Sequence, residues 1–170
     1  MNPRIKIVLF CLTTVAFIGC DRVTKDLAKE HLQFREPLTY LNHTVTLVYA
    51  ENTGAALSFA DNLPRAASFW LLSMLPLAFL AGLTFYTLSR SKQMPFARML
   101  FFSLLIAGGL GNVIDRIVFD RHVTDFMVLG LGRIQTGIFN VADLCVTAGA
   151  IGLMFTIRDK QKVAAQQDHV

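Results

Sequence analysis

Four apolar runs, each bounded by charged side chains, constrain the fold of this chain more than any other feature. The runs cover residues 7–20, 66–89, 99–114 and 144–157. Only the second has the roughly 20 residues that a helix needs to cross a bilayer unaided. Of the 170 residues, 54% are hydrophobic and 16% are charged, whereas a soluble domain carries about 25% charged residues. We therefore expect a single integral membrane domain over residues 1–170, and the composition excludes a disordered chain.

Lys and Arg residues flank the runs unevenly, and their placement predicts the orientation of the chain. They precede the first run, separate the second from the third and follow the fourth, at Arg4, Lys6, Arg90, Lys92, Arg98, Arg158, Lys160 and Lys162. By the positive-inside rule, four spans with both termini in the cytoplasm satisfy this pattern. The predicted spans are 7–25, 66–89, 97–118 and 140–158. Residues 26–65 and 117–139 then face outward.

One alternative stays open for the first run. Its basic start, its apolar centre and the small Gly19 before Cys20 resemble a lipoprotein signal peptide, whose cleavage would leave three spans. Phe17 and Ile18 depart from the usual cleavage pattern, and a cleaved chain of that kind has no evident need for three more membrane runs. We therefore expect four spans.

Three aspartates, Asp21, Asp115 and Asp143, bound three of the runs at one depth. Each adjoins 14 to 16 uncharged residues, which as a helix reach roughly 21–24 Å into a hydrocarbon layer about 30 Å thick. A carboxylate inside lipid is costly unless it is paired. The pattern indicates a shared polar pocket below the outer surface, with Lys25 and Arg116 as counter-charges. The alternative is a set of interfacial ion pairs that only anchor the helix ends.

A fourth acid, Asp125, lies on the same outward side in the segment VTDFM, 18 residues before Asp143. A short re-entrant turn would place this loop acid over the helix acid. Two carboxylates that share a partly dry site cannot both ionise easily, so one keeps a proton while the other acts as a base. Such a pair can take a proton from water and give one to a leaving amine. This predicts peptide hydrolysis without metal or cofactor.

Other kinds of site find little support in the sequence. The histidines are scattered and the cysteines lie at no metal-ligand spacing, so surface or packing roles are expected for His31, His43, His122, His169, Cys11, Cys20 and Cys145. No serine or cysteine lies in a recognisable nucleophile motif. The basic residues form no dense patch, so we expect no nucleic-acid partner.

Two asparagines lie close in depth to the acids. A buried amide needs both donors and acceptors, so Asn112 and Asn140 predict a hydrogen-bonded network or a ligand at this level. Gly108 and Gly109, just before Asn112, predict close helix packing.

The first outward segment predicts a small sheet. LTYLNHTVTLVYA is rich in strand-forming residues and alternates at residues 43–47, which indicates one or two strands. ENTGAALSF follows, with a turn at Asn52 and Gly54. The sheet, within about residues 38–62, would lie on the outer leaflet as a wall beside the acids.

These segments together resemble the lipoprotein signal peptidase family, also called signal peptidase II. Five motifs follow in the family's order from about residue 20 to residue 144: CDRVTK, ENTGAALSF, GGLGNVIDR, VTDF and FNVAD. Each alone is weak, whereas all five in order across four apolar runs are highly specific. The resemblance implies an all-α membrane protein, a four-transmembrane-helix bundle with a small periplasmic β-sheet called a cradle and an outward loop over the site.

The resemblance also implies an activity. The family consists of aspartyl endopeptidases that remove signal peptides from diacylglyceryl-modified prolipoproteins by cutting before the lipidated cysteine. They need no metal or cofactor and are inhibited by the cyclic peptide globomycin. We therefore expect a monomer in the bacterial inner membrane, with its active site near the periplasmic face, diacylated prolipoproteins as substrates and membrane lipid as a partner.

The motifs that carry the resemblance assign roles to individual residues. Asp125 and Asp143 are the expected catalytic pair. The residues expected to bind substrate or orient the pair are Asn52, Gly54, Asn112, Arg116 and Asn140. The residues expected to fix the helix ends around the site are Asp21, Lys25, Asp115 and Ala142.

Three positions depart from the family pattern. Arg22 stands where the family commonly has Gln, Leu57 replaces an aromatic residue, and IQTGIFN lacks the aromatic-proline pair often found before the Phe139-Asn140 motif. These departures concern loop conformation and substrate fit, because none of them touches the two catalytic aspartates.

Two other functional classes remain. Intramembrane acids also mark the paths of ion or proton transporters, which need polar residues at several depths. Here the inner halves of the runs are mainly apolar, and the main exceptions are Cys11, Thr13 and Thr14 in the first run. A non-catalytic membrane subunit, anchored by its acids, is the second alternative.

Overall fold

The computed structural model describes residues 1–53, 64–131 and 134–167, with side chains up to residue 156. Within these residues, three helical segments are long and apolar enough to cross a membrane: α1 (Pro3–Leu32), Arg65–Ser89 and α4 (Phe96–Val118). A further helix, α5 (Val141–Gln167), has a shorter apolar part, Val141–Thr156. The three segments and α5 cover the four runs in which spans are predicted.

The segment Arg65–Ser89 changes its helical form along its length. It consists of α2 (Arg65–Phe69), the π-helical turn η2 (Trp70–Met74) and α3 (Leu75–Ser89). Pro76 lies in the first turn of α3. Since proline has no N–H to donate to the preceding turn, it accounts for the looser helix just before it.

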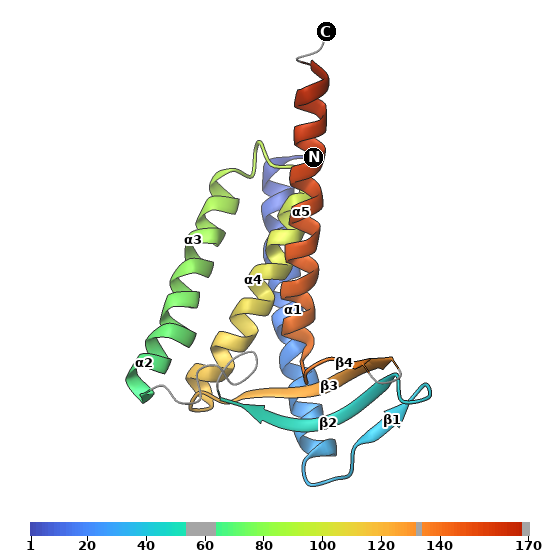
Figure 1. The fold of residues 1–170 in the computed structure, drawn as a ribbon. Helices are drawn as coiled ribbons and strands as arrows, with labels where there is room; N and C mark the ends of the chain where they lie inside the picture. The colour runs from blue at the N-terminus through green and yellow to red at the C-terminus, as the bar shows by residue number, and fades with distance from the viewer. Residues whose placement is uncertain (54–63, 132–133, 168–170) are drawn as a thin grey trace.

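The helices form a bundle with a sheet across one end (Figure 1). α4 packs against α1, α3 and α5, whereas α3 leans away from α5. The N-terminus and the far end of α5 lie at the end of the bundle opposite the sheet. Two basic side chains tie that end together, since Lys6 donates to the carbonyl oxygen of Met94 at 2.8 Å and Arg98 to that of Thr156 at 2.7 Å.

Glycines allow the closest helix contacts. A Cβ atom on Gly108 would lie 2.2 Å from the carbonyl oxygen of Ala142, and one on Gly149 would lie 2.7 Å from the backbone of α4. A Cβ atom on Gly109 would likewise lie 2.8 Å from the side chain of Leu80. The close packing predicted for Gly108 and Gly109 is confirmed, and it seats the start of α5 against α4.

The sheet has four antiparallel strands in the order β1 (Leu38–Tyr40), β2 (Val45–Asn52), β3 (Val123–Leu131) and β4 (Ile134–Gln135). Two strands between residues 38 and 52 are confirmed. Residues 54–62 of the predicted β region lie outside the described residues. The outward segment 117–139, for which a loop is predicted, contains both β3 and β4.

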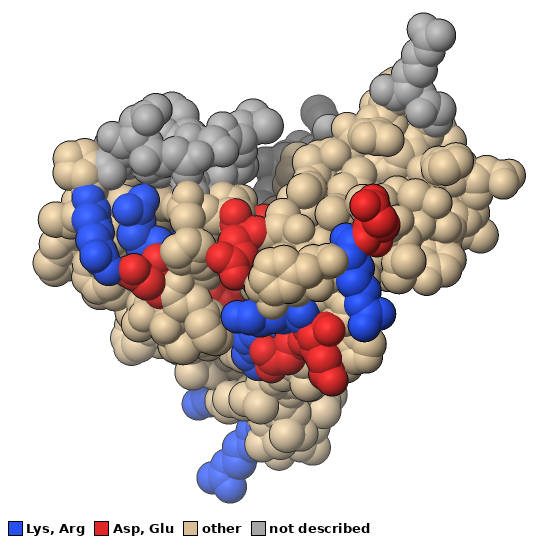
Figure 2. Space-filling view, turned by 90° about the horizontal axis from the view of Figure 1, so that it is seen from below, with Lys and Arg blue, Asp and Glu red and all other residues tan. Residues whose placement is uncertain are grey.

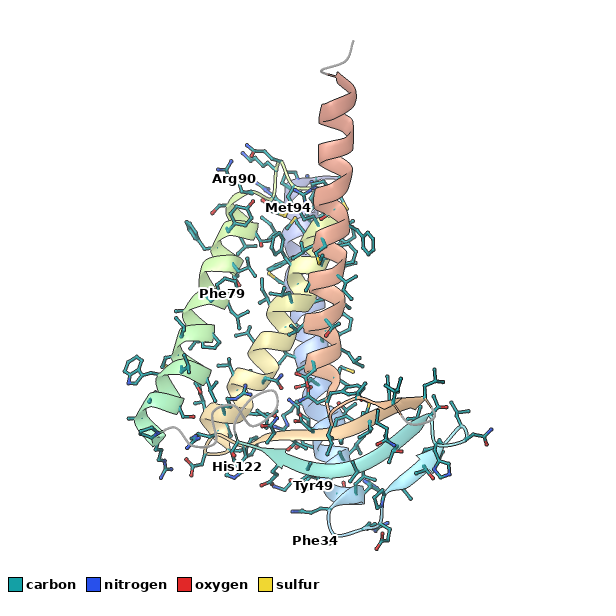
Figure 3. All side chains as sticks on the ribbon, in the orientation of Figure 1. Phe34, Tyr49, Phe79, Arg90, Met94 and His122 are labelled. Atoms are coloured by element: carbon teal, nitrogen blue, oxygen red, sulfur yellow. The ribbon has the colours of Figure 1, made fainter. Side chains whose placement is uncertain are left out.

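The burial pattern reverses that of a soluble protein. Large apolar side chains on the outer helix faces are exposed, including Phe79 at 63% and Phe85 at 75%, while Asp21 and Lys25 inside the bundle are 2% and 0% exposed. Phe79 lies midway along α3, with Arg90 and Met94 at one end of the molecule and Tyr49 and His122 at the other (Figure 3). Charged side chains of both signs spread over the sheet end (Figure 2). This pattern fits a bundle surrounded by lipid.

Candidate active site

The start of α5 carries Asp143 in a reciprocal cap. The backbone N–H of Asp143 donates to Oδ1 of Asn140 at 3.0 Å, and the backbone N–H of Asn140 donates to Oδ2 of Asp143 at 3.1 Å. This is the geometry of a capping box, built here from Asn and Asp. The sequence FNVAD therefore begins the helix and fixes one carboxylate at its first turn.

Asp125 lies on β3, and the register of the sheet gives it a partner. Ala50 pairs with Asp125 and Asn52 pairs with Val123, so Asn52 and Asp125 are diagonal neighbours on one face of the sheet. The Nδ2 atom of Asn52 donates to Oδ2 of Asp125 at 3.1 Å. The prediction that Asp125 lies in a loop is wrong, although the chain does turn back so that Asp125 and Asp143 line one cavity. A paired strand holds Asp125 instead, and its side chain faces inward.

Two asparagines join the carboxylates into one network. Nδ2 of Asn140 donates to Oδ1 of Asp125 at 2.6 Å, and Nδ2 of Asn112 donates to Oδ1 of Asp143 at 2.8 Å. Oδ1 of Asn112 accepts from Nδ2 of Asn140 at 3.1 Å. The network predicted for Asn112 and Asn140 is confirmed, and both aspartates belong to it.

A buried ion cluster lies beneath this network. Nζ of Lys25 is 2.8 Å from a carboxylate oxygen of Asp21 and 2.8 Å from one of Asp115, and it donates to Oδ1 of Asn112 at 3.1 Å. Oδ1 of Asp21 also accepts from the backbone N–H of Ala142 at 2.8 Å. The cluster therefore joins α1, α4 and the first turn of α5, where sequence reasoning placed a shared polar pocket.

The second counter-charge in the cluster is not the predicted one. Arg116 was expected to neutralise its neighbour Asp115, but consecutive residues on a helix point in different directions. Instead, Arg22 on α1 lies 2.9 Å from Asp115. Its guanidinium also pairs with Asp26 and stacks over Phe119, 4.9 Å from the ring centroid. The spacing of four residues in the sequence indicates only the pair of Arg22 with Asp26, and not the pair with Asp115.

The two carboxylates and Arg116 line a cavity of about 760 Å³ between the sheet and helices α4 and α5. Residues of β2, β3 and the segment before α5 form its other walls, notably Asn52, Leu129 and Ile138. The guanidinium of Arg116 donates to the carbonyl oxygen of Asn112 at 3.3 Å, while its buried Nε has no hydrogen-bond partner among the described residues. The cavity thus offers a cation and two carboxylates to one bound molecule.

The environment of Asp125 favours its protonated form. The pKa of Asp125 is raised from its ordinary 3.8 to about 6. Burial is the main cause and the negative charge of Asp143 adds to it, while the hydrogen bonds from Asn52 and Asn140 act in the opposite direction. The side chain is only 4% exposed. A carboxyl group with this pKa can hold or release a proton near neutral pH.

Other residues singled out in the sequence lie outside the described residues or away from the site. Gly54 and the departure at Leu57 lie outside the described residues. Cys145 is buried as a packing residue, whereas Cys11 and Cys20 lie exposed on α1. In the described part of the chain, no group of three or more His, Cys, Asp and Glu side chains could hold a metal ion.

The fold and the site define a class: a helical membrane protein with two hydrogen-bonded carboxylates in a cavity at one end of its bundle. A family model described as Signal peptidase (SPase) II matches residues 13–158. The chain therefore belongs to the signal peptidase II family. Membership makes it a peptidase, hence a hydrolase, that removes signal peptides from prolipoproteins, and its apolar helices make it a membrane protein.

Individual relatives and solved structures agree. The lipoprotein signal peptidase of Chlorobaculum parvum is 36% identical over 162 residues, which cover 90% of this chain and 96% of the relative. That of Treponema denticola is 33% identical over 159 residues, 90% of each chain. Two solved bacterial membrane enzymes share the fold, one with a TM-score of 0.77, 27% identity and coverage of 91% and 90%. The other has a TM-score of 0.74, 28% identity and coverage of 89% and 93%.

We predict that Lys25→Met destabilises the protein by about 3–5 kcal/mol, because it leaves two buried carboxylates without their shared cation. Thermal unfolding of the detergent-solubilised protein measures the effect. Lys29→Met is the matched control on the exposed side of the same helix, and its expected effect stays within about 1 kcal/mol. Equal unfolding temperatures for the two variants would contradict the role given to the ion cluster.

Proposed function

We propose that this chain is an aspartic endopeptidase that cuts diacylglyceryl-modified prolipoproteins immediately before the lipidated cysteine. The observation that carries the proposal is the shared network of Asp125 and Asp143, in which Asn140 donates a hydrogen bond to each carboxylate. Family membership supports the peptidase activity. Neither aspartate forms an ion pair among the described residues, whereas Asp21 and Asp115 both pair with Lys25.

The proposed reaction uses one ionised and one protonated carboxyl group. Asp143 takes a proton from a water molecule as the water oxygen attacks the scissile carbonyl carbon, and the protonated Asp125 donates its proton to the carbonyl oxygen. In the second step Asp143 returns its proton to the departing amine nitrogen and the carbon–nitrogen bond breaks. The hydroxyl proton of the intermediate returns to Asp125, so the enzyme regains its starting state without metal or cofactor.

The residues around the pair are proposed to hold the substrate. Arg116 and Asn52 contact its main chain near the cut, since both line the cavity beside the carboxylates. Asn112 and Asn140 orient the two aspartates through the hydrogen bonds described above. Gly54 is proposed to help shape the substrate site, and a cyclic peptide of the globomycin type is expected to compete for the same cavity.

The proposed setting is the bacterial inner membrane. Four spans, a sheet on the periplasmic side and both termini in the cytoplasm agree with the basic residues at the end of the bundle opposite the sheet. A diacylglyceryl group would hold the substrate cysteine at the membrane surface, so the bond to be cut lies at the depth of the carboxylates. We propose that the enzyme works as a monomer, because one chain contributes both aspartates.

We predict that Asp125→Asn and Asp143→Asn each lower the cleavage of a diacylated prolipoprotein by about a thousandfold or more, because each removes one proton-transfer group. The two variants should still insert in the membrane and unfold cooperatively. Asp120→Asn, an exposed aspartate paired with Arg65 on the same end of the molecule, is the control and should cleave normally. Full cleavage by either Asp→Asn variant would contradict the catalytic role given to Asp125 and Asp143. A non-catalytic or transport role would then remain for the acids.

We predict that kcat/KM falls as pH rises through about 6, because the proton on Asp125, whose pKa is about 6, is lost in the free enzyme. Bound substrate excludes water from Asp125, which disfavours its charged form and raises its pKa in the complex. The corresponding fall in kcat therefore lies at higher pH. Asn52→Ala removes a hydrogen bond that stabilises the carboxylate form of Asp125, which raises its pKa and moves the fall in kcat/KM to higher pH. A midpoint that stays in place in Asn52→Ala would contradict the assignment of the proton to Asp125.

We predict that a reporter fused after Arg121 lies outside the cytoplasm, whereas one fused after Lys92 lies inside it. The expected reason is the excess of Lys and Arg in the segments assigned to the cytoplasm. Enzymatic activity of a reporter that functions only outside the cytoplasm provides the measurement. The reverse pattern would invert the proposed topology.

A further inference from the structure

The chain segment just before α5 departs from regular strand pairing. Gly130 pairs with Gln135, and the next pairing between the same two stretches joins Met127 with Phe139. Between these two pairs, β3 advances by three residues, from Met127 to Gly130, while the partner segment advances by four, from Gln135 to Phe139. Thr136–Ile138 contains one extra residue, which is a β-bulge at the edge of the sheet.

The side chain of Thr136 helps to create this bulge. Its backbone N–H donates to the carbonyl oxygen of Leu129 at 2.8 Å, as in a regular ladder. The returning bond, however, runs from the N–H of Leu129 to the hydroxyl oxygen of Thr136 at 3.0 Å. Because the hydroxyl group takes the place of the backbone carbonyl, the carbonyl oxygen of Thr136 is left without a bond to β3.

The neighbouring backbone groups point away from β3. Phe139 exchanges both of its hydrogen bonds with Met127, each at 2.9 Å. Since successive residues of a strand direct their backbone groups to opposite sides, the N–H and carbonyl of Ile138 face the open edge. Within the described residues, neither Gly137 nor Ile138 makes a backbone hydrogen bond. The sheet therefore ends in a short row of unpaired donors and acceptors.

This open edge lies beside the catalytic cavity. Thr136, Gly137 and Ile138 line the same cavity as Asp125 and Asp143. Leu144 and Thr147 of α5 line the cavity as well, and both side chains are exposed on the outside of that helix. An apolar segment that lies along α5 in the membrane would thus reach the carboxylates beside the open edge.

We propose that Thr136–Ile138 is a strand-docking edge for the substrate. The residues of the prolipoprotein next to its scissile bond bind there in an extended conformation, through main-chain hydrogen bonds that add a short strand to the sheet. The proposal rests on the proposed function. It adds that the peptide leaves its helical form before cleavage, and that the edge recognises backbone shape and not side-chain identity.

A backbone N-methyl scan of the substrate tests the docking edge. Synthetic diacylated peptides each carry one N-methyl group at a residue flanking the cut, and kcat and KM are measured with the wild-type enzyme. Since alternate N–H groups face an edge strand, KM should rise about tenfold at positions two residues apart and stay near normal between them. Equal tolerance at all positions, or equal loss at all of them, would overturn the proposal.

A variant of the enzyme tests the same edge from the other side. Thr136→Val removes the hydroxyl acceptor of the N–H of Leu129, so that N–H turns to the carbonyl of Thr136 and the bulge that opens the edge is reduced. KM should rise several-fold with kcat unchanged, and Thr136→Ser, which keeps the hydroxyl, should restore it. A fall in kcat or in unfolding temperature without a change in KM would show a structural role only. If the unmodified peptide is not cleaved at all, the proposed function fails and the docking edge fails with it.

Discussion

The structure depends on one buried lysine that two carboxylates share. Lys25 is fully buried, and its ammonium group bonds to Asp21, Asp115 and Asn112. A charge in this position is tolerated only because its partners come from two helices, which must therefore stay in contact. Asp21 in turn caps the N-terminal turn of α5 through Ala142. One ion cluster thereby fixes where three helices meet and how the chain that carries Asp143 begins.

The two layers of acids differ in the chemistry of their partners. Asp21 and Asp115 pair with the cations Lys25 and Arg22, which fix their positions. Asp125 and Asp143 receive hydrogen bonds from the neutral side chains of Asn52, Asn112 and Asn140. An amide fixes the position of a carboxylate without cancelling its charge, so repulsion and burial can still raise the pKa of Asp125. The first layer gives rigidity, and the second keeps the freedom to exchange protons that the proposed reaction needs.

Much of this was predictable from the sequence, because charges inside apolar runs have few possible positions. Counting residues from the ends of the runs placed Asp21, Asp115 and Asp143 at one level, and the network around Asn112 and Asn140 followed from the need to pair buried amides. The strand around Asp125 was missed because an inward-facing acid breaks the alternation by which strands are recognised. The pairing of Arg22 with Asp115 depends on how α1 and α4 rotate against each other, and no local pattern reports that rotation.

In the proposed enzyme, a short stretch of chain, residues 136–143, would connect the position of the substrate to the chemistry. It contains the unpaired edge at Ile138, the bridging amide of Asn140 and the carboxylate of Asp143. Between the edge and Asn140, the backbone N–H and carbonyl of Phe139 both form hydrogen bonds with β3. A peptide strand added at the edge would be in fixed register with both carboxylates, since the same stretch carries one of them and bonds to the other. Because the backbone of the enzyme sets this register, the position of the cut would follow from where the lipid anchor stops the peptide, and substrates of differing sequence could be cut at one place.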